Sequence, residues 1–213
     1  MSVIIQFEND DFLIIHKPAG LEFHGGDGVL NKLRINHTDA LGVHRLDRGT
    51  SGLMLFAKTK EAQRDLSQLF ENKKVRKTYI ALSNLKPRKK QGGIKGDLEK
   101  SRGGSYKLTR NMVNPSNTKF KSTKFSSSEL WGFVLNPLTG KTHQLRVVLK
   151  SLGSTIVGDE RYNGIDSDRM YLHSYSLKFK YKGFEYNFEG YPIMGKLFMD
   201  NKAELLEFIG LSA

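Results

Sequence analysis

The sequence contains no cysteine, so the chain can form neither a disulfide nor a thiolate metal site. It also lacks any apolar run close to the roughly 20 residues that a membrane-spanning helix requires. Residues 1–11 have neither the basic start nor the long apolar stretch of a signal peptide. We therefore expect a cytoplasmic protein that does not enter a membrane.

Acidic residues are scarce relative to basic ones, with 22 Asp and Glu against 34 Lys and Arg and a formal charge of +12. A surplus of this size favours polyanionic partners, because each neutralised phosphate releases counterions and adds affinity that does not depend on sequence. Nucleic acid is the expected partner. An acidic membrane surface is the weaker alternative, since no basic amphipathic helix stands out.

The stretch from Gly42 to Lys58 reads GVHRLDRGTSGLMLFAK. It places a polar loop with Arg45 and Asp47 before a small-residue turn and a dense apolar run, which predicts a buried strand. A carboxylate at the mouth of a core strand is held rigidly, and catalysis needs this because a misplacement of about 1 Å can cost about a hundredfold in rate. Asp47 is therefore the first candidate for chemistry. The alternative is a structural Arg–Asp ion pair or a capped loop amide.

The order of residues in this stretch is also informative. Val43 to Asp47, two free positions, Thr50-Ser51-Gly52 and an apolar strand together resemble the signature of the RluA-type pseudouridine synthases, of the RluA/RsuA superfamily. The resemblance implies that Asp47 is the catalytic nucleophile, that Arg45 fills the space left by a flipped base, and that His44 helps to bind substrate. It also implies a single catalytic domain over residues 1–213 without an S4 domain, since the first family motif begins near residue 12.

Two further segments resemble the same family. Residues 77–81, KTYIA, are similar to its Lys-x-Tyr-x-Ala strand, which implies that Tyr79 stacks on the target base and takes part in proton handling. Residues 139–146, TGKTHQLR, are similar to its Gly-Arg-Thr-His-Gln-Ile-Arg segment, which implies that Arg146 pairs with the nucleophilic aspartate. Judged on the residue alone, a tyrosine on a strand is more often part of the core.

The remaining candidates for substrate binding are Leu172, Lys17, Lys141, His143 and Gln144. The resemblance places Leu172 beside the base, in a Leu-His strand. Lys17 belongs to an opening motif of the form strand, Lys-Pro-x-Gly; a strand-ending turn explains its proline and glycine, and the lysine could meet a phosphate. Lys141 replaces the usual arginine of the family, which keeps the charge but loses the bidentate fork. Val148 replaces a common histidine and is expected to pack.

Strand patterns dominate the sequence, over residues 3–7, 12–17, 53–57, 75–82, 106–110, 118–125, 129–135, 170–181 and 184–191. Helical patterns cover residues 60–73, with Thr59 as its cap, 142–152, with Gly153 as its stop, and 202–209, and one helical turn is expected at 29–34. Together they predict an α+β fold with a mixed, mainly antiparallel sheet. The resemblance implies the same fold, bent and with a central cleft. Residues 84–104 are either a solvated, mobile loop or a phosphate-contacting insertion that orders on RNA.

The reaction that the resemblance implies is the isomerisation of a specific uridine in a stem-loop of tRNA or ribosomal RNA. It breaks the N-glycosidic bond, rotates the uracil and rejoins it through carbon, after the base has been flipped out of its stack. This requires neither a redox change nor an energy input, so we expect no cofactor. The sequence has no glycine-rich phosphate fingerprint, and its histidines lack the spacing of metal ligands, so we expect no metal either.

Two other functions fit the same charge. A catalytically silent RNA-binding or RNA-chaperone protein on the same fold would use the basic surface without the reaction. A small basic ribosome-associated structural protein would also explain the charge but would leave the motif around Asp47 without a reason. For the pseudouridine synthase we expect a monomer that binds RNA.

Overall fold

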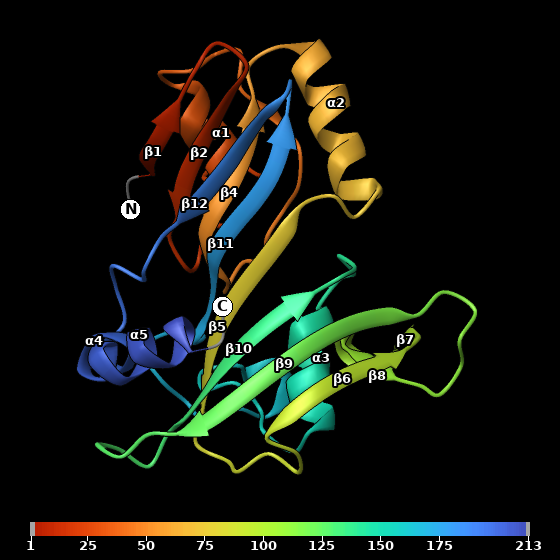
Figure 1. The fold of residues 1–213 in the computed structure, drawn as a ribbon, viewed down its shortest axis with the longest axis vertical. Coiled ribbons are helices and arrows are strands. Elements are labelled where there is room, and N and C mark those ends of the chain that lie inside the picture. Colours follow the sequence, from red (N-terminus) through yellow and green to blue (C-terminus); the bar gives the residue numbers. More distant parts are fainter. Residues whose placement is uncertain (1–2, 212–213) are drawn as a thin grey trace. The chain divides into compact units, whose positions relative to one another are not determined.

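The computed structural model describes residues 3–211 and divides the chain into two compact units. Unit 1 comprises residues 3–77 and 173–192, and unit 2 comprises residues 78–172 and 193–211. Each unit combines a mainly antiparallel sheet with a few helices, which confirms the predicted α+β class (Figure 1). Across residues 3–211, no helix is long and apolar enough to cross a membrane. That the whole chain acts as one catalytic domain stays a prediction.

The sheet of unit 1 has its strands in the order β1-β2-β4-β11-β12, with the short β3 paired to β4. The strands are β1 Ile4–Glu8, β2 Phe12–Lys17, β3 Leu41–Gly42, β4 Ser51–Ala57, β11 Leu172–Tyr181 and β12 Phe184–Glu189. Only the first residue of β11 belongs to unit 2. All these pairs are antiparallel except β4 with β11, which run parallel. Every residue of β4 is buried, as the apolar run after Asp47 predicted.

Two helices belong to unit 1, α1 Val29–Arg34 and α2 Lys60–Glu71. The predicted cap of α2 is confirmed, because Thr59 Oγ1 accepts a hydrogen bond from the Ala62 N–H at 3.1 Å. Ala62 and Leu66 are buried in the core, as the helical spacing predicted. The helix ends two residues before the predicted Lys73, because that residue has φ 58°, in the left-handed region that cannot continue an α-helix.

The sheet of unit 2 has the order β5-β10-β9-β6, and all its pairs are antiparallel. Its strands are β5 Arg76–Ser83, whose first two residues belong to unit 1, β6 Gln91–Gly96, β9 Ser116–Lys124 and β10 Trp131–Pro137. A separate ribbon consists of β7 Leu98–Lys100, the 3-10 turn η1 Arg102–Gly104, and β8 Tyr106–Leu108. Helix α3 Gln144–Ser151 lies behind β9 and β10 in Figure 1. The 3-10 turn η2 Glu160–Tyr162 and helices α4 Lys196–Asp200 and α5 Lys202–Gly210 complete the unit.

Residues 84–104 include β6, β7 and η1, so the interpretation of this segment as a mobile loop is wrong for most of residues 91–104, and its contact with phosphates stays a prediction. The strand β6 was missed because its sequence, QGGIKG, has no alternation of apolar and polar residues. Its order comes from backbone pairing with β9, where Gly92 lies opposite Phe120 and Lys95 opposite Asn117. Backbone pairing of this kind leaves no periodic signal in the side chains.

Helix α3 begins two residues later than predicted, at Gln144 instead of Thr142. The reason is His143, whose φ of 56° lies in the left-handed region, so the preceding residues cannot be helical. The predicted apolar stripe is confirmed by the burial of Leu145, Val148 and Leu149, and Val148 packs as expected. The predicted stop is also confirmed, since Gly153 has φ 77°.

Candidate active site

Asp47 lies in the turn that leads into β4. The Thr50 N–H donates to the backbone oxygen of Asp47 at 3.0 Å, which closes the turn one residue before the strand begins. Leu46 is buried and anchors the segment, whereas Arg45 is exposed and Asp47 is half-buried. The carboxylate is thus carried at the mouth of a fully buried strand, as the sequence predicted.

Lys17, the last residue of β2, stabilises the same turn. The residue is 1% exposed, and its ammonium donates to three backbone carbonyls, those of Pro18 at 2.9 Å, Arg48 at 3.1 Å and Thr50 at 2.7 Å. An ammonium has three donors, and these three acceptors can satisfy all of them. These hydrogen bonds fix the turn after Asp47. A phosphate contact by Lys17 stays a prediction.

A histidine fixes the first residue of β4. Ser51 Oγ lies 2.7 Å from His173 Nδ1, and His173 Nε2 lies 2.8 Å from the Gly190 carbonyl. A carbonyl only accepts, so we assign the proton to Nε2, and Ser51 donates to Nδ1. At the next position, a side chain on Gly52 would collide with the backbone of Ser174, so β4 and β11 approach more closely than any other residue would allow. These contacts hold the strand that follows Asp47.

His44 precedes Arg45 in this loop and is held by contacts with β4 and α2. Its ring stacks on Phe70 with centroids 4.4 Å apart, and its Nε2 accepts the Leu55 N–H at 3.0 Å. Burial, with a smaller contribution from the charge of Lys77, lowers the pKa of His44 to about 3. The ring is therefore neutral at physiological pH. Direct substrate contact by His44 stays a prediction, and its described contacts position the Arg45 to Asp47 loop.

The lowered pKa of His44 predicts a loss of stability in mild acid. Below about pH 6.5 the unfolded chain protonates this ring and the folded chain does not, so the contribution is fully present above pH 6.5 and declines as pH falls towards 3. Between pH 7.5 and 5.5 we expect His44 to remove about 1.4 kcal/mol from the free energy of unfolding. Urea unfolding of the wild type and of His44→Gln at both pH values measures the difference.

In that comparison, His44→Gln should flatten the decline by about this amount, because glutamine keeps an acceptor for the Leu55 N–H but does not titrate. The exposed His24 of the same unit provides the matched control, and His24→Gln should retain the full decline. Equal pH dependence in the wild type and His44→Gln would contradict a buried neutral ring.

The segment before α3 is fixed by Gln144, which is buried. Its Oε1 accepts from Thr139 Oγ1 at 2.8 Å and from the Lys141 N–H at 3.0 Å, and its Nε2 donates to the Asn117 carbonyl and to Thr118 Oγ1. These four bonds use the full capacity of one side-chain amide. The Lys141 ammonium donates to the Asn114 carbonyl at 2.5 Å. Substrate contacts by Gln144 and Lys141 stay predictions.

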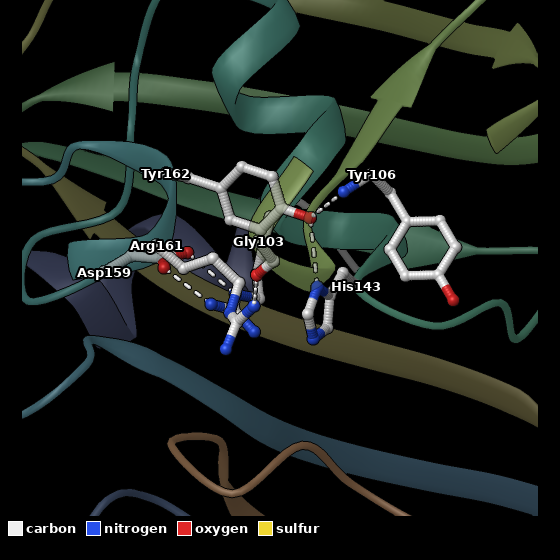
Figure 2. Close-up of polar contacts among 7 residues, drawn as sticks. Gly103, Tyr106, His143, Asp159, Arg161 and Tyr162 are labelled. Carbon is white, nitrogen blue, oxygen red and sulfur yellow. Dashed lines mark hydrogen bonds and ion pairs between the residues drawn. The ribbon is translucent and has the colours of Figure 1, made fainter. Parts of the chain in front are cut away.

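Arg146 lies in α3 and is almost completely buried. Its Nε donates to Asp159 Oδ2 at 2.8 Å and its Nη2 to Asp159 Oδ1 at 2.7 Å, and the guanidinium lies 4.9 Å from the centroid of the Tyr162 ring. The Tyr162 hydroxyl lies 3.0 Å from His143 Nδ1 and accepts the Tyr106 N–H at 2.9 Å (Figure 2). Tyr162 therefore connects the start of α3 with the β7–β8 ribbon.

The other two predicted site residues lie on strands. Tyr79 is in β5, opposite Leu135 of β10, and only 9% of it is exposed. Leu172 is buried at the first position of β11. Neither position shows by itself whether the side chain contacts a base, so both roles stay predictions.

Within unit 1 the structure brings together the segments that carry Lys17, His44, Arg45 and Asp47, and within unit 2 it brings together His143 and Arg146. The pairing of Asp47 with Arg146 stays a prediction. Sequence reasoning missed Asp159 and Tyr162. The available signal was a carboxylate one glycine after the apolar Ile156-Val157, where a buried charge requires a partner. Among residues 3–211, no three His, Asp or Glu side chains gather as metal ligands would.

Comparison with known proteins identifies the family. Residues 11–151 match the model of a family described as RNA pseudouridylate synthase. A protein of Haemophilus influenzae named as an uncharacterized RNA pseudouridine synthase is 44% identical over 188 residues, which cover 85% of this chain and 84% of that protein. A ribosomal large subunit pseudouridine synthase C of Rickettsia bellii is 37% identical over 84% of this chain, and the match spans 64% of that longer protein.

Solved structures share the fold. The human RNA pseudouridylate synthase domain containing 1 matches with a TM-score of 0.77 at 24% identity, over 89% of this chain and 83% of that one. The human RNA pseudouridylate synthase domain containing 4 matches with a TM-score of 0.75 at 23% identity, over 95% and 93%. The fold is thus that of a pseudouridine synthase domain. The chain belongs to the RNA pseudouridine synthase family, of the RluA type, whose members are isomerases that act on RNA.

Proposed function

We propose that this protein converts a specific uridine of ribosomal or transfer RNA into pseudouridine, with Asp47 as the nucleophile. The observation that carries the proposal is the seat of Asp47, in a turn closed by the Thr50 N–H, held by the Lys17 ammonium and followed by a strand that is buried throughout. An aspartate that served only as a surface ion pair would not require such support. The membership of the family supplies the reaction class.

The proposed roles follow from what each side chain can do. The N-glycosidic bond breaks, the uracil turns, and a carbon–carbon bond to the same sugar forms, so substrate and product contain the same atoms and no cofactor is consumed. Asp47 initiates the reaction, Tyr79 stacks on the base and handles a proton, and Arg146 stabilises the reacting carboxylate. The exposed Arg45 fills the space that the flipped base leaves. Leu172 packs beside the base.

Recognition of the RNA rests on charge and on the shape of a folded RNA. The formal charge of +12 supplies affinity for phosphates. We propose that Lys17, His44 and Gln144 act through the loops that they hold, whereas Lys141 and His143 lie on the border that a substrate would approach. The maturation of ribosomal and transfer RNA would place the protein in the cytoplasm, and we expect it to act as a monomer.

The test is a map of pseudouridine at single-nucleotide resolution. Total RNA from a strain that lacks the protein is incubated with and without purified protein, and the two maps are compared. A new site at one or a few uridines supports the proposal and names the target. If RNA binds tightly but no new site appears, either in this RNA or in RNA from ribosome assembly intermediates, the proposal fails and the catalytically silent RNA-binding protein becomes the better explanation.

A further inference from the structure

Asp159 forms an ion pair with Arg146. It lies outside residues 11–151, the part of the chain that matches the family model. Its side chain is 1% exposed, and its two oxygens accept from Nε and Nη2 of Arg146, at 2.8 and 2.7 Å. A bidentate contact of this kind fixes the plane of the guanidinium as well as its distance. The Arg146 side chain is therefore oriented by Asp159.

The face of the same guanidinium is fixed by a second group. The ring of Tyr162 lies 4.9 Å away and forms a cation–π contact, and the Tyr162 hydroxyl is itself anchored by the Tyr106 N–H. Asp159 thus holds one edge of the guanidinium while Tyr162 covers its face. Two such restraints leave the side chain of Arg146 very little freedom to move.

The backbone around Asp159 is closed into a tight turn. The Asp159 N–H donates to the Ile156 carbonyl at 3.1 Å, and the Asp159 carbonyl accepts from Tyr162 and Gly164 at 3.1 and 2.9 Å. A side chain on Gly164 would collide with the Ile156 carbonyl, so the turn is packed against its own backbone. The carboxylate is consequently held as rigidly as the arginine that it orients.

Stability alone gives little reason for this arrangement. The desolvation of two charges roughly cancels their attraction, and a well-packed apolar pair often stabilises a protein equally well or better. Unlike an apolar pair, a buried bidentate ion pair also fixes the direction in which the guanidinium points. The contact with Asp159 uses Nε and Nη2, one edge of the guanidinium, so a second carboxylate would bind along the other edge.

We propose that Asp159 is a positioning residue, which acts through Arg146 by fixing the plane and the direction of the guanidinium that the proposed reaction uses. The inference rests on the proposed role of Arg146 in pseudouridine formation. It adds a residue outside the motifs that resemble the family, and it assigns to Asp159 an effect on the rate of the chemical step and none on the affinity for RNA.

The test compares Asp159→Asn with the wild type in a single-turnover reaction at saturating RNA. Asparagine keeps the shape but loses the charge and one acceptor, so the guanidinium is no longer fixed. We expect the rate to fall by about a hundredfold and the dissociation constant for RNA to stay within about threefold, a small change on the scale of tenfold per 1.4 kcal/mol. The NMR signal of the Arg146 Nε–H, assigned by its loss in Arg146→Lys, should exchange faster with water.

The matched control is Asp168→Asn in the same unit. The Asp168 side chain accepts from the Tyr171 hydroxyl and from the Lys196 N–H, and it has no described contact with Arg146. The Asp168→Asn variant should react within about twofold of the wild-type rate, since surface changes away from the reacting groups have small effects. An unchanged rate in folded Asp159→Asn, or an equal loss in Asp168→Asn, would overturn the proposal.

If Asp159→Asn does not fold, Asp159→Glu decides the question. It keeps the charge but moves the carboxylate by one methylene, so we expect a fivefold or larger loss of rate with unchanged RNA affinity, on the order of the cost of a sub-ångström displacement. A wild-type rate in this variant would refute the positioning role. If the wild type itself forms no pseudouridine, the proposed function fails, and the Arg146 signal still reports whether Asp159 orients the guanidinium.

Discussion

Asp47→Asn should abolish pseudouridine formation, with a loss in rate of about 10⁴-fold or more, as the removal of a nucleophile typically produces. Asparagine has nearly the same shape, but its amide is not a nucleophile under these conditions. The turn should persist, because the Thr50 N–H bonds to the backbone oxygen of residue 47 and not to its side chain. RNA affinity and thermal stability should therefore stay close to those of the wild type. Single-turnover conversion of the mapped RNA site measures the loss.

A control for this result is available in the same unit. The side chain of Asp27 is 99% exposed and contacts Lys32 at 3.3 Å, so Asp27→Asn makes the same chemical change at a surface site. This variant should react at the wild-type rate. Substantial turnover by Asp47→Asn would remove Asp47 from the chemistry, and a loss of folding in Asp47→Asn would mean that the carboxylate is structural.

Lys17→Met should produce the second large effect, and it should appear first in stability. Methionine fills a similar volume, but it leaves the carbonyls of Pro18, Arg48 and Thr50 without the donors that they have now. Leaving buried acceptors unsatisfied costs about 1–3 kcal/mol each, less whatever relaxation recovers, so we expect a loss of about 3 kcal/mol. For a chain of this length, this corresponds to a fall in the melting temperature of about 10 °C.

The same variant should also react slowly below its melting temperature. The turn that carries Asp47 would be less well fixed, and a displacement of about 1 Å costs about a hundredfold in rate. The exposed Lys60 offers a control for the loss of one charge, and Lys60→Met should change neither property. If Lys17→Met were as stable as the wild type but bound RNA weakly, Lys17 would be a phosphate ligand, as the sequence alone allowed.

The sequence was sufficient to predict the elements that are stabilised by the packing of their side chains. The apolar run after Asp47 predicted β4, and the spacing of Ala62 and Leu66 predicted α2 together with its cap at Thr59. It was insufficient where the backbone decides, as in β6, which is ordered by its pairing with β9 despite two consecutive glycines. It also placed the start of α3 too early, because nothing in a histidine signals a left-handed conformation.

The candidate site shows the same division. Asp47 and Arg146 could be selected because they stand in recognisable motifs. Asp159 could not, since an isolated aspartate has no periodicity, and its importance appears only when its two oxygens are seen on one guanidinium. The three carbonyl acceptors of Lys17 could not be predicted either, because a lysine in a sequence does not show which way its ammonium points, and its phosphate contact stays a prediction.

The turn after Asp47 is held by contacts to the main chain. Lys17 binds carbonyls, the Thr50 N–H binds the backbone oxygen of Asp47, and the Gly20 N–H binds the carbonyl of Arg48. The exposed side chain of Arg48 adds one more contact to the main chain, from its Nε to the Gly20 carbonyl at 3.1 Å. Most bonds that hold this turn would therefore survive changes of the side chains on its outer surface. Under the proposed role of Asp47, an engineer could alter these side chains to suit a different RNA and leave the carboxylate in its place.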